Sequence, residues 1–204
     1  VYKTSSVEMD TELGEDITLY DSKKKMPVID ISLPKASFPQ TRPKLIAKAY
    51  NRKSASDADN AGADIIYYDI FKDDIKDLSS GLRHARLFLS TPRWILDIDI
   101  PKLLSRIKDI RPEGILVGNR GLLKHLPKIG YLKKDDIHLD YSFNCFNDLD
   151  IRYYSQGIPT ISPELSLKDL ADIKDKNFIS LAHGDIILMS TKEDLKAPEL
   201  VDEK

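Results

Sequence analysis

Polar side chains crowd residues 138–150, "HLDYSFNCFNDLD", where an apolar strand pattern changes into a helix pattern. Asp140, Asn144 and Asn147 surround Cys145, the only cysteine of the chain. Carboxylate and amide groups at this spacing could bind a polar substrate, and an amide could stabilise an oxyanion. In parallel α/β sheets, functional groups gather at the carboxyl ends of the strands, where the loops meet. We therefore predict that Asp140, Asn144 and Asn147 line a shared substrate-binding pocket.

Three further candidates stand at the ends of other apolar runs. Asn119 ends one such run and is expected to join the substrate-binding residues. Glu164 follows another run, and a carboxylate that points into a barrel mouth needs a partner or solvent. His183 closes a third run, where its imidazole could transfer a proton near neutral pH or serve as a hydrogen-bonded structural residue.

Several of these residues also have a purely structural interpretation. Asn147 could cap the helix that follows it, and Glu164 could belong to a turn that leads into the next helix. His138 and Asp140 alternate on one strand face, where such a polar pair could serve only to orient each other. For Cys145 a small buried side chain is favoured over a nucleophile, which would need an adjacent histidine.

The pocket residues are set in an alternation of apolar runs and helical segments that begins at Lys44. This alternation is typical of βα units around a parallel sheet. Seven strands are one short of a closed eight-stranded barrel, so the sequence predicts an α/β fold of the (β/α) TIM-barrel type that is incomplete. The predicted strands are 44–50, 64–70, 85–90, 114–119, 136–143, 159–163 and 177–184.

The segments between the strands carry helix signals. A helix within 54–64 is expected to begin at Ser54 or Ser56 as its N-cap and to stop at Gly62. A second helix is predicted over 100–110, with its proline in the first turn, where proline is accepted.

A third helix is predicted over 166–175. Ser166 is expected to be its N-cap, with Asp169 as a capping-box partner. A stripe at helical spacing should pack this helix onto the sheet. The residues of the stripe are Leu167, Leu170 and Ile173.

The chain divides into three segments by pattern. Residues 1–43 have short alternating runs and predict a small, antiparallel β-rich element ahead of the barrel-like domain, 44–191. Residues 192–204 predict a polar, frayed tail. Because the sequence begins at Val1 and not at methionine, we interpret the chain as a piece of a longer protein.

Composition excludes several classes of protein. The 31 basic and 33 acidic residues nearly cancel, so net charge does not favour nucleic acid. A single cysteine excludes a disulfide framework and a thiolate cluster within one chain, and the sequence predicts no metal or cofactor site. No apolar run approaches the roughly 20 residues needed to span a bilayer, and the N-terminus lacks a signal-peptide pattern, so we predict a cytoplasmic protein.

Four stretches together resemble the collagenase-like protease family, peptidase family U thirty-two. They are, in order, "GADIIYYDIF", "GILVGNRGLLKHL", "HLDYSFNCFNDLDIRYYSQGIPTISPELSLKDLADI" and "ISLAHGDIILMST". The resemblance runs from about Lys44 to Thr191, and residues 1–43 look like the β-rich lead-in to the C-terminal copy of this unit in longer members. It implies a barrel-like peptidase domain that acts on a peptide or protein by an unassigned mechanism.

If the chain hydrolyses peptides, we predict Glu164 or His183 as the general base that activates a water. Asn144 or Asn147 would then stabilise the oxyanion. No standard nucleophile elbow, zinc helix, phosphate loop or dinucleotide fingerprint is present to suggest another mechanism.

Two alternatives follow from departures from the family pattern. Some members act in RNA or quinone hydroxylation with an iron–sulfur cluster held by four cysteines. Here Ile187 and Asp194 stand where the family has cysteines, and Ile179 stands where it has a glutamate. The chain could therefore be a noncatalytic domain that binds a partner, or an RNA-modification module without its cluster ligands. Its partners would then be RNA, the rest of the full-length chain, or a second copy joined through an exposed sheet edge.

Overall fold

Six β-strands alternate with six α-helices in residues 42–187, the part of the chain that the structure, a computed structural model, describes. The strands are β1 (Ile46–Lys48), β2 (Ile65–Asp69), β3 (Arg86–Ser90), β4 (Gly114–Val117), β5 (Ile137–Leu139) and β6 (Ile158–Pro159). The helices are α1 (Arg52–Asn60), α2 (Ile75–Gly81), α3 (Ile100–Ile110), α4 (Arg120–His125), α5 (Asp148–Tyr153) and α6 (Leu167–Asp172). This alternation confirms the predicted α/β class.

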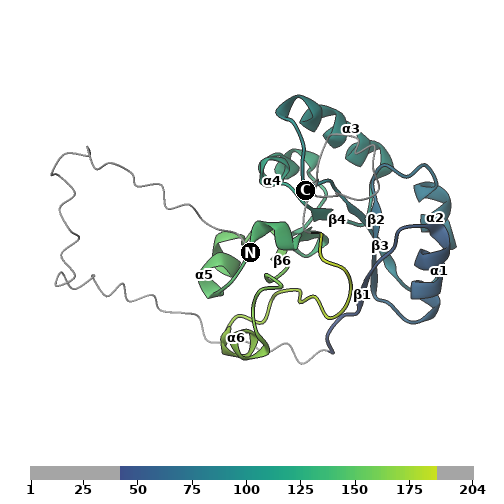
Figure 1. The fold of residues 1–204 in the computed structure, drawn as a ribbon. Helices are drawn as coiled ribbons and strands as arrows, with labels where there is room; N and C mark the ends of the chain where they lie inside the picture. Colours follow the sequence, from purple (N-terminus) through teal and green to yellow (C-terminus); the bar gives the residue numbers. More distant parts are fainter. Residues whose placement is uncertain (1–41, 188–204) are drawn as a thin grey trace, which may run out of the picture. The chain divides into compact units, whose positions relative to one another are not determined.

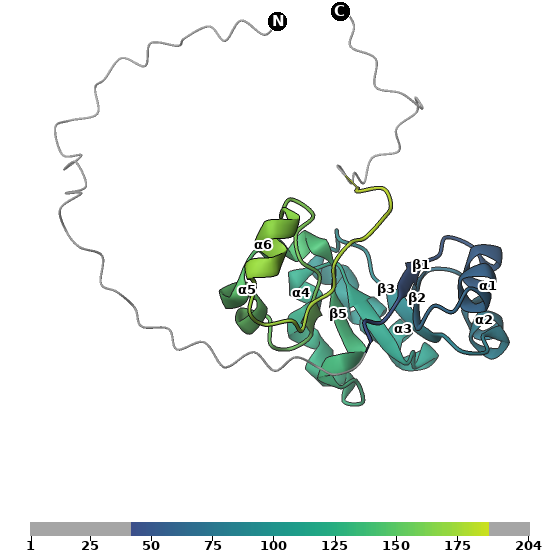
Figure 2. The ribbon, with the colours of Figure 1, turned by 90° about the horizontal axis from the view of Figure 1, so that it is seen from below.

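The strands form one parallel sheet whose order, β1-β2-β3-β4-β5-β6, follows the order of the chain. The sheet curls into a half-barrel, with helices along its outer side (Figures 1 and 2). Because all strands run the same way, their carboxyl ends meet at one edge, which we call the C-terminal edge. The loops that follow β3, β4 and β5 therefore become neighbours at this edge.

The predicted seventh strand, 177–184, does not form as a regular strand. Only Ile179 pairs with the sheet, through one parallel bridge to Thr160 beyond β6. Its main-chain N–H donates to the Pro159 carbonyl at 2.9 Å, and its carbonyl accepts from the Ile161 N–H at 2.8 Å. Residues 180–187 are all exposed, so this apolar run has no face to bury and pairing stops after one residue.

The predicted strand 136–143 is also shorter in the structure. β5 ends at Leu139, and Tyr141–Phe143 form a single 3-10 turn that is closed by a hydrogen bond from the Phe143 N–H to the Asp140 carbonyl. Asn144 then adopts a left-handed conformation with φ 51°, which asparagine tolerates better than most residues. The turn redirects the chain from the sheet toward α5.

The two faces of the sheet differ in what covers them. Outer-face residues such as Tyr68, Leu89 and Val117 form the main core with buried residues of α1 to α4. The inner face carries a smaller apolar cluster, formed by Ile65, Tyr67, Phe88 and Leu116. Gly114 is needed on this face, because an added Cβ would lie 2.3 Å from the buried ring of Phe88.

The helices predicted within 54–64, over 100–110 and over 166–175 form as α1, α3 and α6, with shifted bounds in α1 and α6. α3 spans 100–110 as predicted, and Leu103 and Ile107 are buried. α1 is capped by Asn51, whose side chain accepts a hydrogen bond from the Ser54 N–H, so the predicted caps at Ser54 or Ser56 are wrong. Asn51 accepts from the Ser54 N–H, one of the N–H groups at the helix start that have no partner within the helix, so the helix begins before either serine.

α6 confirms the predicted cap but only part of the predicted stripe. Ser166 and Asp169 form the capping box. Leu170 and Ile173 pack in a small cluster with Cys145, whereas Leu167 is 86% exposed. The helix is only six residues long, so its first residue lies beyond the edge of the surface that it covers.

Two sequence predictions fall on parts of the chain outside the described residues. These are the β-rich element of 1–43, apart from its last two residues, and the polar tail of 192–204. Among the described helices, none is long and apolar enough to cross a membrane.

A buried carboxylate fixes the loop that leads into β3. Asp59 of α1 is 3% exposed and accepts hydrogen bonds from the N–H groups of Arg83, His84 and Ala85 at 2.7–3.0 Å. Burial opposes the ionisation of this carboxyl, but the three hydrogen bonds and the nearby His84 outweigh it and hold its pKa below the ordinary value. An ionised Asp59 is therefore part of the fold.

We expect Asp59→Asn to lower the free energy of unfolding by about 2–3 kcal/mol, because an amide cannot accept from all three N–H groups. Asp57→Asn in the same helix is the matched control, since Asp57 only forms an exposed ion pair with Lys53; its effect should stay below about 0.5 kcal/mol. The lowered pKa means that the contribution of Asp59 is present near neutral pH and is lost as pH falls through its folded-state value. Equal unfolding midpoints in urea for the two variants would contradict this role.

Candidate functional site

A partly buried ion pair joins two loops at the C-terminal edge of the sheet. The Nε of Arg93, in the loop after β3, donates to Oδ2 of Asp140, in the loop after β5, at 2.6 Å. The two side chains are only 19% and 14% exposed. Removing one partner of such a pair is destabilising, because it leaves the other charge poorly hydrated and without a counter-charge. Asp140 therefore lies at the predicted edge, but its partner was not among the predicted site residues.

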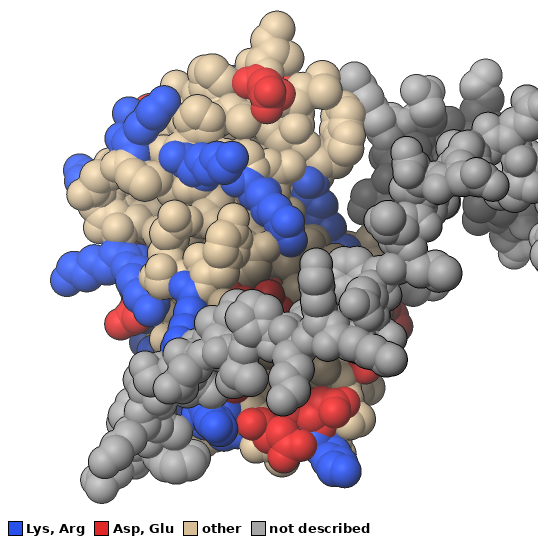
Figure 3. All heavy atoms as spheres, turned by 90° about the vertical axis from the view of Figure 1, so that its left-hand side faces the viewer, with Lys and Arg blue, Asp and Glu red and all other residues tan. Residues whose placement is uncertain are grey.

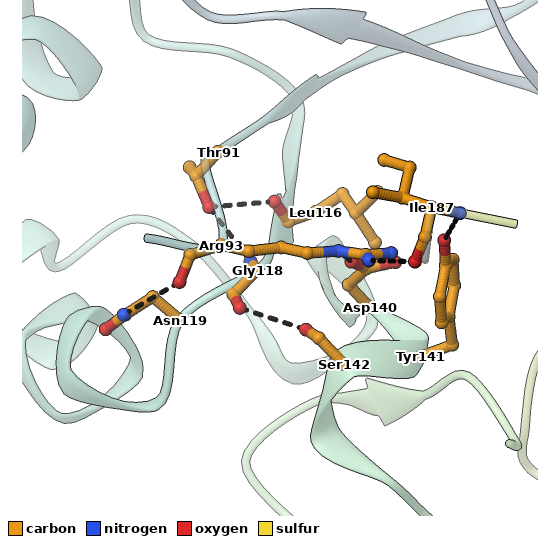
Figure 4. A network of polar contacts seen from close by, with 9 residues as sticks. All are labelled: Thr91, Arg93, Leu116, Gly118, Asn119, Asp140, Tyr141, Ser142 and Ile187. Atoms are coloured by element: carbon orange, nitrogen blue, oxygen red, sulfur yellow. Dashed lines mark hydrogen bonds and ion pairs between the residues drawn. The ribbon is translucent and has the colours of Figure 1, made fainter. Parts of the chain in front are cut away.

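The loop after β4 lies between the two loops that carry this pair, and hydrogen bonds hold it there. Thr91 Oγ1 donates to the Leu116 carbonyl at 3.1 Å and accepts from the Gly118 N–H at 3.0 Å. Ser142 Oγ donates to the Gly118 carbonyl at 3.0 Å. Gly118 is needed for this approach, since an added Cβ would lie 2.9 Å from the carbonyl oxygens of Thr91 and Pro92. Figure 4 shows the resulting network.

Asn119 positions the Arg93 loop. Its Nδ2 donates to the Arg93 carbonyl at 3.0 Å, and its Oδ1 accepts from the Leu122 N–H at 3.1 Å, which caps α4. Both ends of the amide are thus engaged within the fold. The structure brings Asn119 to the predicted edge and gives it a loop-positioning contact there.

Tyr141 completes the surroundings of Arg93. The guanidinium lies over its ring, with 3.9 Å between Arg93 Cζ and the ring centroid. Burial opposes the charge on Arg93, but hydrogen bonding to Asp140 and Tyr141 outweighs it and raises the pKa. Arg93 therefore stays a cation.

The segment Gly184–Ile187, which we call the strap, ends against this group. The Ile187 N–H donates to Tyr141 Oη at 2.8 Å, and Arg93 Nη1 donates to the Ile187 carbonyl at a long 3.4 Å. Figure 4 shows Ile187 beside the guanidinium and above the Tyr141 hydroxyl. Arg93 and Tyr141 together thus contact both main-chain polar groups of one residue.

The remaining nitrogen of Arg93 has no partner. Nη2 is buried and makes no hydrogen bond with any residue of the described structure. Buried donors are almost always satisfied in folded proteins, and an orphan guanidinium N–H is costly. This donor is therefore the feature of the site that the fold itself does not explain.

The other predicted site residues do not join this network. Asn147 caps α5 by accepting from the N–H groups of Leu149 and Asp150 at 2.9 and 3.0 Å, which confirms the capping interpretation. Asn144 is exposed in its left-handed conformation. Neither side chain contacts Arg93 within the described residues, so the predicted pocket is brought together only at Asp140 and Asn119.

The two predicted general bases are exposed. Glu164 lies in a turn in which its N–H donates to Ser162 Oγ at 3.4 Å, and His183 precedes Gly184, which has φ 133°. Among residues 42–187, no hydrogen bond or ion pair joins either side chain to another residue. The structure therefore supplies no orienting partner for either base.

Cys145 has the buried structural role that the sequence favours. It is fully buried beside Ile151, Ile161 and Ile173. Burial, together with the charge of Asp150, raises the pKa of its thiol to about 12. The thiol is therefore neutral near pH 7 and unsuited to act as a nucleophile.

His138 lies on the inner face, but its partner is not Asp140. Tyr67 Oη lies 2.6 Å from His138 Nδ1, and the ring packs 4.8 Å from that of Phe88 between centroids. Burial, with the charges of Lys44 and Arg86, lowers the pKa of His138 to about 4, and burial raises the pKa of Tyr67. A neutral imidazole that accepts from a neutral hydroxyl fits both shifts. Asp140 pairs with Arg93 instead because its side chain lies beyond the end of β5.

Charge and metal-ligand geometry limit what the site can do. Within the described residues, no group of three or more His, Cys, Asp or Glu side chains is placed to hold a metal ion. Figure 3 shows basic side chains spread among uncharged residues on one side of the molecule. The chemistry that the C-terminal edge offers is therefore hydrogen-bond donation from Arg93 and acceptance or donation by the Tyr141 hydroxyl.

Sequence reasoning missed Arg93 and Tyr141. A signal was present for Arg93, since it closely follows the predicted strand 85–90, a strand end from which no candidate was drawn. Tyr141 was assigned to a strand, and only the 3-10 turn places its hydroxyl at the edge.

Comparisons of the chain with protein-family models, curated proteins and solved structures found no match.

We expect His138 to make stability depend on pH between about 6.5 and 4. Its pKa is lowered from 6.5 to about 4 on folding, so the unfolded chain binds more protons in this range and the free energy of unfolding decreases as the pH falls. A shift of this size corresponds to about 3 kcal/mol once pH is below both values. Urea unfolding of wild type and His138→Gln at several pH values measures the difference. His183→Gln, at an exposed position, is the control; equal pH dependence in all three proteins would contradict a neutral buried imidazole.

Proposed function

We propose that this chain binds peptides at the C-terminal edge of an incomplete (β/α) barrel of the TIM-barrel type. The observation that carries the proposal is the contact of Tyr141 and Arg93 with both main-chain groups of Ile187. Every peptide residue except proline offers the same N–H and carbonyl groups. A pair of side chains that binds them in the strap can bind them in another extended peptide, largely without regard to its side chains.

The proposal treats the chain as related to the collagenase-like protease family and as part of a longer protein. The four quoted stretches support this relation, and so does the parallel order of βα units, in which the C-terminal edge is the usual place for a ligand. The partner is then a peptide or protein. Further strands from a second copy or from elsewhere in the protein would close the barrel.

Peptide hydrolysis is the second candidate function. It is favoured by the place of His183 in sequence, which immediately precedes the strap that reaches Arg93 and Tyr141. Glu164 and His183 are both exposed and so are accessible to a water and a substrate. Because neither has an orienting partner among the described residues, binding is proposed as the primary activity and hydrolysis as an addition to it.

We expect a fluorescein-labelled peptide of mixed sequence to bind the full chain. In an Ile187→Pro background, in which residue 187 no longer donates to Tyr141, Tyr141→Phe should weaken binding about 5–10-fold, since one hydrogen bond of about 1 kcal/mol is lost. Fluorescence anisotropy measures the affinity. Tyr131→Phe is the matched control, because the Tyr131 hydroxyl bonds the Ile107 carbonyl. Equal affinities for Ile187→Pro and the double variant Ile187→Pro/Tyr141→Phe would contradict the proposed site.

If Glu164 or His183 is the general base, we expect Glu164→Gln or His183→Ala to lower the rate of hydrolysis of fluorescently quenched gelatin or casein at least about 100-fold. Peptide affinity should stay within a factor of two in the same variants. Turnover that both variants retain would remove these residues from the mechanism. Peptide binding without turnover in wild type would leave the binding function alone.

A further inference from the structure

The guanidinium of Arg93 has more donors than the fold uses. Asp140 takes Nε, and the Ile187 carbonyl takes Nη1 at 3.4 Å, beyond the usual range for this bond. Nη2 is buried and has no hydrogen-bond partner among residues 42–187. One carbonyl oxygen is thus placed before a fork of two nitrogens, and it satisfies that fork only in part.

A carboxylate would satisfy the same fork fully. Its two oxygens match Nη1 and Nη2 in a bidentate pair, which is the stronger and more directional form of arginine recognition. Asp140 holds Nε from the other side, and the Tyr141 ring lies against the guanidinium, so the fork is fixed in direction before a ligand arrives. Such preorganisation lowers the entropic cost of binding.

We infer that the Arg93–Tyr141 site takes the C-terminal residue of a peptide, with its free α-carboxylate on Arg93 Nη1 and Nη2 and its N–H on Tyr141 Oη. This inference rests on the proposed peptide-binding function and narrows its substrate class. The N–H and carbonyl of Ile187 already occupy these positions, and a terminal residue differs from Ile187 only in its second carboxylate oxygen. That oxygen is the partner which Nη2 lacks.

The strap then acts as an internal competitor for the site. Its described contacts with Arg93 and Tyr141 are two hydrogen bonds made by one residue, Ile187. Gly184, where the strap begins, has a positive φ of 133°. Residues 180–187 are all exposed, so few buried contacts oppose their displacement. Ile187→Pro removes the N–H that donates to Tyr141 and should release the site.

The test compares two peptides with the sequence of residues 182–187, "AHGDII", which ends with the strap. Both carry an N-terminal fluorescein, and one has a free C-terminal carboxylate whereas the other has a C-terminal amide. We expect the full-length chain to bind the acid at least tenfold more tightly than the amide in anisotropy titrations at low salt. Ile187→Pro should raise the affinity for the acid at least threefold. Because Arg93→Gln alone leaves Asp140 without its partner, the double variant Arg93→Gln/Asp140→Asn is used, and it should bind acid and amide equally.

Arg111→Gln is the matched control. Arg111 also lies over a tyrosine ring, that of Tyr131 at 5.3 Å, but has no part in the site, so its variant should keep the tenfold preference. Equal binding of acid and amide by wild type would overturn the carboxylate inference while leaving peptide binding intact. No binding of either peptide to wild type or to Ile187→Pro at 1 mM, a ceiling of about −4 kcal/mol, would overturn both proposals. An affinity unchanged by Ile187→Pro would show that the strap does not occupy the site.

Discussion

The ion pair between Arg93 and Asp140 connects strands that are not neighbours in the sheet. β4 lies between β3 and β5, so the pair spans the end of β4. The loop after β4 must therefore lie close to the end of the sheet. Gly118 makes this possible because its carbonyl and N–H bond the flanking loops at distances that a side chain would prevent. Without that close approach, Arg93 and Asp140 would have to extend around a bulkier loop. The geometry of the whole edge therefore depends on this one crossing.

The same pair explains why the guanidinium presents its outer edge to the strap. A charge that is largely removed from water needs a counter-charge, and Asp140 supplies it at Nε. Asn119 fixes the backbone of Arg93, and the Tyr141 ring fixes the plane of the guanidinium. Of the donors that remain, Nη1 points at the main-chain carbonyl of Ile187. An arginine fixed in this way is what the proposed recognition of a peptide requires.

The buried pair of His138 and Tyr67 on the inner face of the half-barrel is neutral. His138 is uncharged over most of the physiological range, and its Tyr67 partner is a neutral hydroxyl. Phe88 and Leu116 surround the pair with apolar surface, and Phe88 needs Gly114 beneath its ring. The ion pair of Arg93 and Asp140 lies at the C-terminal edge, and that of Arg86 and Asp136 lies at the opposite ends of the strands. This separation is consistent with an interior that supports the fold and an edge that meets ligands.

Local signals predicted the helices and the central strands well. The apolar spacing and Pro101 defined α3, and the serine–aspartate pair defined the start of α6, because both depend on interactions within one turn. The strand predicted at 136–143 ends early, at Leu139, because the chain turns away, and the strand predicted at 177–184 is reduced to one bridge at Ile179. A pattern in one segment cannot report whether a second segment is present beside it.

The sequence by itself determined that βα units would place polar groups at one edge, and that Asp140 and Asn119 would be among them. Only the tertiary structure decided their roles, because Arg93 and Asp140 are 47 residues apart and meet across an intervening strand. The contact of Tyr141 with Ile187 spans 46 residues and depends on a 3-10 turn in place of a strand. Local chemistry sets which groups a segment offers, whereas the curl of the sheet sets which of them come within hydrogen-bonding distance.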